Sequence, residues 1–313
     1  MSDFTNVKEV LVSMELSARN LKGVIVAIPT PFTDKDEVDQ IALRKLTSRL
    51  IKNGIHGIMT CGGTGEFPHL LPEEKSKVTE VVVREAKGKV PVIACTSACG
   101  VKETIMNTKH AATIGADAAI IVPPFYFPLT EESMYQYYSE IAKASPLPIV
   151  VYNNPGYTKN NIPPQLMAKI SGIEGVIGVK QSQYDISQTF EMIRLIGDKI
   201  SIMTGIDSQF YQVLMLGGRG IFSTAAAVIP KQMVAIYNAV QKGAPGKALE
   251  IQKEIQVLNK FFEYDPGYVA PCKEALSMLG LPIGKARAPL PCLSAEERRE
   301  MQAALFAMGL LTA

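Results

Sequence analysis

The chain has 313 residues, of which 47% are hydrophobic and 20% charged, and its formal net charge is +2. This length suits one barrel-sized domain or two smaller ones. Both signs of charge are mixed along the chain, without a basic block or an acidic tail, so we expect neither nucleic acid nor a membrane surface as a partner. No apolar run approaches the ~20 residues that a membrane span needs.

The cysteines and the N-terminal segment bear on the compartment. The five cysteines are scattered and none belongs to a CxxC pair, a usage typical of a reducing compartment. The N-terminal stretch is rich in charge, with neither a long apolar run nor a cleavage pattern, so it does not resemble a signal peptide. We expect a cytoplasmic protein in which residues 1–22 form an N-terminal arm. The cysteines are Cys61, Cys95, Cys99, Cys272 and Cys292.

Short apolar runs recur along the chain, and an amphipathic stretch follows each. The runs are nearly continuous and rich in β-branched residues, which is typical of strands buried on both faces. Helical patterns lie between them, for example at 41–53, 72–86 and 130–144. The second of these opens with Glu73 and Glu74, which suit a helix N-terminus. The predicted strands are 24–28, 57–60, 90–94, 118–122, 148–152, 176–180, 200–204 and 220–223.

The number and spacing of these units predict the fold. Eight strand–helix units spaced by about 20–35 residues match a (β/α)8 TIM barrel of the α/β class. An open doubly wound sheet would need fewer units or a second domain, and no linker separates two halves. We expect an arm at 1–22, a barrel at 23–229 and C-terminal helices at 230–313 packed on the barrel. These last helices are predicted at 231–242, 246–262, 270–279 and 294–310.

Active sites of TIM barrels lie at the carboxyl ends of the strands. Lys180 ends the apolar run 176–179, so its amine would face a mostly apolar barrel mouth. Burial favours the neutral amine, which is the form that attacks a carbonyl carbon. Tyr152 ends the preceding strand, where a phenol could carry protons. Taken singly, a solvent-facing lysine and a rim tyrosine explain these positions as well, but together they supply the nucleophile and proton carrier of imine chemistry.

Two glycine-rich stretches differ in their place relative to the strands. Gly62-Gly-Thr-Gly65 follows the second strand, where exposed N–H groups could hold a carboxylate or phosphate, although a tight βα turn explains it too. Gly217-Gly-Arg-Gly220 precedes the last strand, so we assign it to the opposite face as a structural loop. The three histidines, which show no metal-ligand spacing and so argue against a metal-dependent aldolase, are His56, His69 and His110.

From about residue 23 to its C-terminus, the chain resembles the dihydrodipicolinate synthase / N-acetylneuraminate lyase family of class I aldolases. The resemblance implies a barrel with C-terminal helices, no cofactor, a small 2-keto acid as substrate, and a homotetramer built as a dimer of dimers. The motifs that carry it are Gly62-Gly-Thr-Gly-Glu66, Pro124-Phe-Tyr126, Tyr152-Asn-Asn-Pro155, Gly178-Val-Lys180 and Gly217-Gly-Arg-Gly-Ile-Phe-Ser223.

The resemblance also implies residue roles. Lys180 forms a Schiff base with pyruvate or a related 2-keto acid, and Tyr152 shuttles protons. Thr64 and the amides of Gly63 and Thr64 hold the keto-acid carboxylate. The further residues of the expected catalytic and substrate-binding set are Tyr126, which reaches the neighbouring subunit's site, Phe222, whose carbonyl faces the keto acid, Tyr157 and Gly205.

Two positions depart from the synthases of this family. Synthases usually carry two threonines after the first glycine of the turn; here the first is Gly63, so a hydroxyl of a Tyr–Thr–Tyr relay is missing. They also carry an arginine that binds the carboxylate of the aldehyde substrate, and that position is Tyr157. The strand ends offer neutral hydrogen-bonding groups, which suit a polyol chain. The polar residues at the strand ends, of which Asp207 is the one carboxylate, are Thr96, Ser97, Asn153, Asn154, Gln181, Ser182, Asp207, Ser223 and Thr224.

These departures lead to three hypotheses. The first is a Schiff-base lyase, an aldolase or dehydratase, acting on pyruvate or a 2-keto-3-deoxy sugar acid; the Gly-Gly-Thr-Gly-Glu-Phe variant resembles the family's sugar-acid dehydratases. The second is a 4-hydroxy-tetrahydrodipicolinate (dihydrodipicolinate) synthase, which condenses pyruvate with aspartate semialdehyde. The third is a non-catalytic keto-acid sensor. The presence of both Lys180 and Tyr152 disfavours the sensor, because binding alone needs neither an imine nor a proton shuttle.

Overall fold

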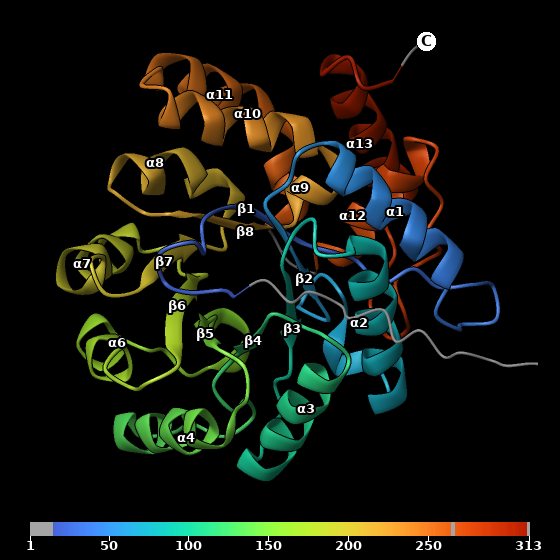
Figure 1. Ribbon diagram of the computed structural model, residues 1–313. Helices are drawn as coiled ribbons and strands as arrows, with labels where there is room; N and C mark the ends of the chain where they lie inside the picture. Colours follow the sequence, from blue (N-terminus) through green and yellow to red (C-terminus); the bar gives the residue numbers. More distant parts are fainter. Residues whose placement is uncertain (1–14, 264–266, 312–313) are drawn as a thin grey trace, which may run out of the picture.

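The computed structural model describes residues 15–263 and 267–311, so most of the predicted arm at 1–22 lies outside the described residues. Eight parallel strands form a closed barrel in which β1 pairs with both β2 and β8 (Figure 1). The predicted TIM barrel is therefore confirmed. The strands are β1 (Gly23–Ala27), β2 (Gly57–Thr60), β3 (Val92–Cys95), β4 (Ala118–Ile121), β5 (Ile149–Asn153), β6 (Val176–Gln181), β7 (Ser201–Thr204) and β8 (Gly220–Ser223).

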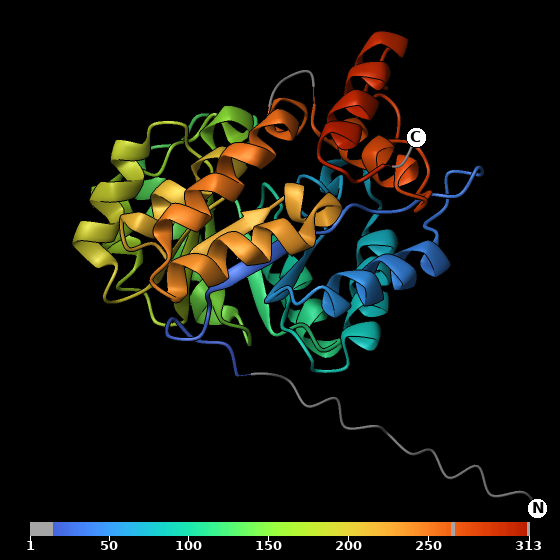
Figure 2. The ribbon, with the colours of Figure 1, turned by 90° about the horizontal axis from the view of Figure 1, so that it is seen from above.

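Helices surround the barrel, and further helices from the C-terminal part of the chain pack next to them. Figure 2 shows α10 and α11 running side by side, and α13 packs on α11 and α12. The boundary at residue 230 stays a prediction. The helices are α1 (Gln40–Lys52), η1 (Phe67–His69), α2 (Pro72–Ala86), α3 (Val101–Thr113), α4 (Glu131–Ala144), α5 (Pro155–Thr158), α6 (Pro164–Ile170), α7 (Ile186–Ile196), η2 (Asp207–Gln209), α8 (Phe210–Met215), α9 (Ala225–Val228), α10 (Pro230–Gln241), α11 (Pro245–Phe262), α12 (Val269–Met278) and α13 (Ala295–Ala307).

Local sequence explains where these elements begin. Every residue of the eight strands is buried, as expected for strands covered on both faces. Asp39 Oδ1 accepts hydrogen bonds from the amides of Ile41 and Ala42 at the start of α1, and Thr130 caps α4 in the same way. Each cap satisfies amides that have no partner within the helix, and so defines the first turn.

The register of the sheet brings the two main candidates together. Tyr152 on β5 pairs with Lys180 on β6, so the two side chains leave the barrel at the same level. Lys180 pairs in turn with Met203 on β7. The predicted neighbourhood of the lysine and the tyrosine at adjacent strand ends is therefore confirmed.

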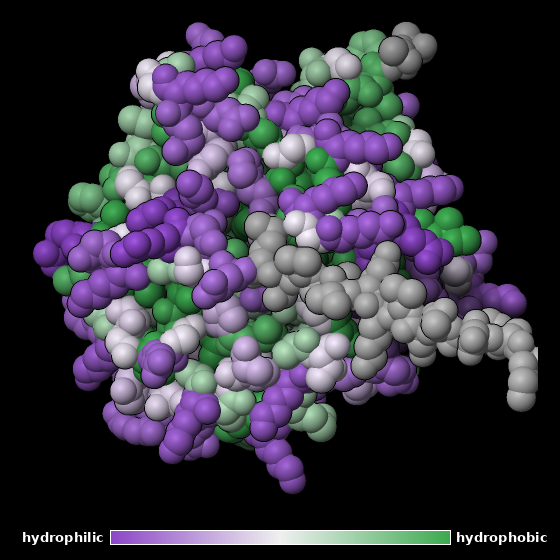
Figure 3. Space-filling view, in the orientation of Figure 1, coloured by the Kyte–Doolittle hydropathy of each residue, from purple (hydrophilic) through white to green (hydrophobic). Residues whose placement is uncertain are grey.

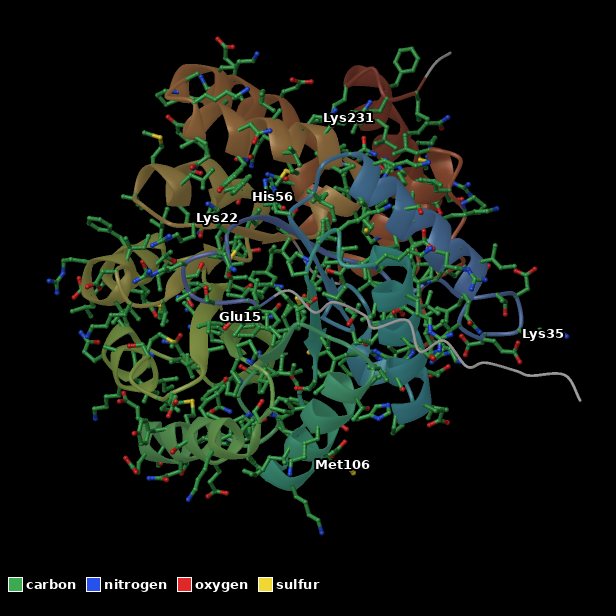
Figure 4. All side chains as sticks on the ribbon, in the orientation of Figure 1. Glu15, Lys22, Lys35, His56, Met106 and Lys231 are labelled. Atoms are coloured by element: carbon green, nitrogen blue, oxygen red, sulfur yellow. The ribbon has the colours of Figure 1, made fainter. Side chains whose placement is uncertain are left out.

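The opposite end of the barrel is structural. His56 precedes β2, and its Nδ1 accepts a hydrogen bond from the Val24 amide at 3.1 Å; Figure 4 labels it beside Lys22, where the strands begin. Gly220, in the second glycine-rich loop, lies against Gly23, because a Cβ at Gly220 would lie 2.1 Å from the Gly23 carbonyl oxygen. Polar side chains are spread over this face (Figure 3).

Within 15–263 and 267–311, no group of three or more His, Cys, Asp or Glu side chains is arranged to hold a metal ion. No described helix combines the length and the apolar character needed to span a bilayer.

Candidate active site

A cavity of about 410 Å³ opens at the carboxyl ends of the strands. It collects five of the eight residues predicted for the site, namely Thr64, Tyr152, Tyr157, Lys180 and Gly205. The strand ends supply most of its wall, and the C-terminal helical region supplies the rest. The other lining residues are Asn154, Gly156, Ser182, Gln183, Tyr184, Ile206, Thr224, Phe262, Glu263 and Tyr268.

Lys180 is the reactive candidate at the floor of this cavity. Its side chain is only 4% exposed, and Nζ lies 4.1 Å from the centroid of the Tyr152 ring. The Phe222 ring lies 5.8 Å from the same atom and the Met59 sulfur 4.0 Å. The neighbours of the amine are therefore two aromatic rings and a thioether, and no acidic side chain among the described residues forms an ion pair with it. Such an amine is available to attack an electrophile.

Tyr152 is held by its strand and by one side-chain contact. It is 4% exposed, and its hydroxyl accepts a hydrogen bond from Asn154 Nδ2 at 3.1 Å. The phenol therefore has a defined place beside the Lys180 amine. A group with this geometry can pass protons to and from the oxygen of a substrate whose carbon is bonded to Nζ.

The turn after β2 forms one side of the cavity and is anchored at both ends. Thr64 is buried, and its hydroxyl lies 2.8 Å from that of Thr224. Thr30 Oγ1 donates to the carbonyl of Gly65 at 2.7 Å. Glu66 adopts a left-handed backbone with φ of 62°, and its buried carboxylate pairs with Lys273. The predicted anion-binding turn therefore lies at the cavity, beside Lys180.

The ion pair of Glu66 and Lys273 ties this turn to α12. Lys273 Nζ lies 2.6 Å from Glu66 Oε1, with both side chains at most 2% exposed, and Nζ also donates to the Lys285 carbonyl at 2.9 Å. The Arg287 amide donates to Glu66 Oε2 at 2.7 Å. Burial lowers the pKa of Lys273, and Glu66 opposes that shift. Because the pair is buried, it couples the C-terminal helices to the turn.

The residues that sequence reasoning missed come mostly from outside the strand ends. Ser208 donates to both carboxylate oxygens of Glu263, through its amide at 2.5 Å and its hydroxyl at 2.7 Å. Burial, helped by the nearby Asp207, raises the pKa of Glu263 to about 7. Tyr184 donates to the Glu263 carbonyl at 2.6 Å. Glu263 directly follows α11 and Tyr268 directly precedes α12, so neither residue belongs to the strand ends from which the site was predicted.

Few of the polar strand-end residues predicted from the sequence line the cavity. Only Asn154, Ser182 and Thr224 line it. The others serve the fold, because the interior of the barrel contains many backbone and side-chain groups that need partners. The groups that bond within the protein instead are Thr96, Ser97, Asn153, Gln181, Asp207 and Ser223.

Three predicted residues lie outside this wall. Gly63 lines a neighbouring cavity of about 290 Å³, which also borders on Tyr152 and Tyr157. Phe222 is buried beneath Lys180. Tyr126 is 83% exposed, with φ of 89°, and is not among the residues that line either cavity.

Comparison with known proteins agrees with this architecture. The model of the Dihydrodipicolinate synthetase family matches residues 20–308. The 4-hydroxy-tetrahydrodipicolinate synthase of Thermodesulfovibrio yellowstonii is 40% identical over 292 residues, which are 93% of this chain and 99% of that protein.

Solved structures give the same result. Dihydrodipicolinate synthase from Aquifex aeolicus has a TM-score of 0.88 at 33% identity, covering 92% of this chain and 98% of that one. The chloride-inhibited dihydrodipicolinate synthase from Acinetobacter baumannii, complexed with pyruvate, has a TM-score of 0.89 at 32% identity, covering 93% and 99%.

The fold and the cavity together define a (β/α)8-barrel lyase of the class that works through a lysine Schiff base. The chain belongs to the dihydrodipicolinate synthetase family, which confirms the resemblance seen in the sequence.

Proposed function

We propose that Lys180 forms a Schiff base with the keto carbon of pyruvate or a related 2-keto acid. The observation that carries this proposal is the buried Lys180 amine, set 4.1 Å from the centroid of the Tyr152 ring at the floor of the cavity. Pyruvate is the ligand of the related Acinetobacter baumannii synthase. Tyr152 transfers protons, and Thr64 with the amides of the turn after β2 holds the substrate carboxylate.

The second substrate has two candidates. The names of the relatives favour a 4-hydroxy-tetrahydrodipicolinate synthase, which reverses the order of the hypotheses drawn from sequence. The lining of the cavity favours a 2-keto-3-deoxy sugar acid, because the described wall contains no arginine and instead carries Glu263. A carboxylate-bearing aldehyde normally needs a cation for a bidentate contact.

The experiment compares both reactions on the same enzyme. Condensation of pyruvate with aspartate semialdehyde and cleavage or dehydration of 2-keto-3-deoxy sugar acids are followed by coupled assay and mass spectrometry. The larger kcat/KM identifies the activity. Release of no product from either class, with pyruvate still bound, would support the keto-acid sensor instead.

We further propose a cytoplasmic homotetramer in which Tyr126 reaches the neighbouring subunit's site. Tyr126 and Phe127 are 83% and 70% exposed, with ring centroids 4.9 Å apart. Adjacent exposed aromatic rings suit an interface better than a solvated surface. Sedimentation measures the assembly. Mixing Lys180→Ala with Tyr126→Phe subunits should restore activity if the site is shared, and should not if each subunit is self-contained.

A further inference from the structure

Position 63 has no side chain, and the hydroxyl of Tyr268 occupies the space that one would take. A Cβ built on Gly63 would lie 2.2 Å from Tyr268 Oη and 3.5 Å from Cζ. The first distance is too short for two non-bonded heavy atoms, whereas the second is ordinary contact. Glycine at 63 and tyrosine at 268 therefore form a matched pair, in which the tyrosine returns a hydroxyl to the place where Gly63 lacks one.

The position of Tyr268 is set by the same turn that it contacts. Tyr268 directly precedes α12, and Lys273 on that helix pairs with Glu66, three residues after Gly63. Two contacts thus join the start of α12 to one turn. The ring of Tyr268 borders on the Lys180 cavity and on the 290 Å³ cavity beside it.

The protonation of Tyr268 suits a donor. Burial, with contributions from Tyr152, Tyr157 and Tyr184, raises the pKa of Tyr268 well above its usual range. Its phenol therefore keeps its proton at neutral pH. Tyr268 and Tyr152 both line the Lys180 cavity. Among the described residues, no protein group is hydrogen-bonded to Tyr268 Oη.

We propose that Tyr268 is the proton-relay partner of Tyr152 during Schiff-base formation, an inference that rests on the proposed function. The Lys180 ammonium carries three N–H protons and the protonated imine carries one, so two protons pass to the keto oxygen. The C–O bond breaks, that oxygen leaves as water, and the C=N bond forms, without a net gain or loss of protons. Tyr152 donates a proton to the keto oxygen. Tyr268 then protonates Tyr152 again. Tyr268 in turn takes its proton from water in the cavity, and that water has accepted a proton from Nζ. Tyr268 acts through Tyr152 and is a positioning residue.

The test removes the hydroxyl of Tyr268 and then introduces a serine hydroxyl at position 63. Tyr268→Phe should slow the formation of the borohydride-trapped pyruvate adduct by about 100-fold, the lower end of the range for a lost proton-transfer group. In Tyr268→Phe/Gly63→Ser, the new Cβ meets only Cζ, at 3.5 Å, and the serine hydroxyl should restore most of the lost rate. Gly63→Ser alone should be slow, because serine collides with Tyr268. Tyr211→Phe, a half-buried tyrosine on α8 outside the cavity, is the matched control and should keep the wild-type rate.

Rescue separates a relay from a packing effect, since a merely structural defect would not be repaired by a hydroxyl at position 63. The relay is overturned if Tyr268→Phe forms the adduct at the wild-type rate, or if the double variant stays as slow as Tyr268→Phe. Failure of the wild-type chain to form any adduct at Lys180 would instead refute the proposed function.

Discussion

The Cε atom of Lys180 lies 2.7 Å from the point that a Cβ on Gly205 would occupy. Gly205 directly follows β7, and Ser182 Oγ lies within 2.0 Å of the same point. Both atoms belong to flexible side chains, so they can move when a methyl group arrives there. The absence of a side chain at Gly205 therefore leaves the space that the Lys180 side chain occupies. The contribution of Gly205 to the substrate site is steric.

Gly205→Ala should lower kcat while leaving the fold intact. A displacement of about 1 Å at a reacting group costs roughly 10²-fold in rate, and we expect a loss of that order. Gly246→Ala is the matched control, because a Cβ at Gly246 meets nothing within 4 Å. Steady-state kinetics with melting temperatures measures both. An unchanged kcat in Gly205→Ala would show that the position of the Lys180 amine does not depend on the space left by Gly205.

Tyr157→Arg should favour aspartate semialdehyde as the second substrate. Tyr157 is 57% exposed at the rim of the cavity, where a guanidinium could meet a carboxylate. Hydrogen bonds to charged groups contribute about 1.5–3 kcal/mol, so KM for the semialdehyde should fall about tenfold or more. Tyr157→Phe removes the hydroxyl without adding charge and controls for the lost phenol. A KM that is equal in the arginine and phenylalanine variants would place the aldehyde carboxylate elsewhere.

Glu263 should make stability depend on pH in an unusual direction. Its pKa is raised from 4.5 to about 7, so the folded protein holds a proton that the unfolded chain has already lost within this window. The free energy of unfolding should therefore fall as pH rises from about 4.5 to about 7. Urea denaturation of the wild type and of Glu263→Gln compares the slopes. Parallel slopes in the two proteins would mean that Glu263 titrates normally in the fold.

The buried pair of Glu66 and Lys273 should matter more to stability than an exposed pair of similar length. Glu66→Gln leaves an ammonium buried without its partner and should cost about 3–5 kcal/mol. The control is Lys260 with Glu300, 2.7 Å apart and about half exposed, where Glu300→Gln should cost less than about 1 kcal/mol. Chemical denaturation measures both costs. Equal losses would mean that the turn after β2 does not depend on α12.

The fold could be predicted from the sequence because its signals are local. Strands buried on both faces read as continuous apolar runs, and helix starts such as Asp39 and Thr130 carry their own capping oxygens. Lys180 and Tyr152 were found because parallel strands bring their carboxyl ends to one rim. Each of these inferences needs only neighbouring residues and the topology.

The rest of the cavity depends on contacts between distant segments. Tyr268 and Gly63 are 205 positions apart in the chain, and nothing in the local pattern around either residue signals that one fills the space of the other. Glu263 enters the site for a similar reason, through Ser208 on η2. Polar strand-end residues such as Asn153 and Gln181 do not line the cavity, because Asn153 Nδ2 donates to Gln181 Oε1 inside the barrel.

The most direct test of the account is to incubate the protein with pyruvate, reduce it with borohydride and map the adduct by peptide mass spectrometry. The account predicts one reduced pyruvate adduct, on Lys180, which disappears in Lys180→Ala. Tyr152→Phe should still form it, but more slowly by roughly 10²–10⁴-fold. An adduct on another lysine, or none at all, would contradict the central claim that the buried amine at the end of β6 is the nucleophile.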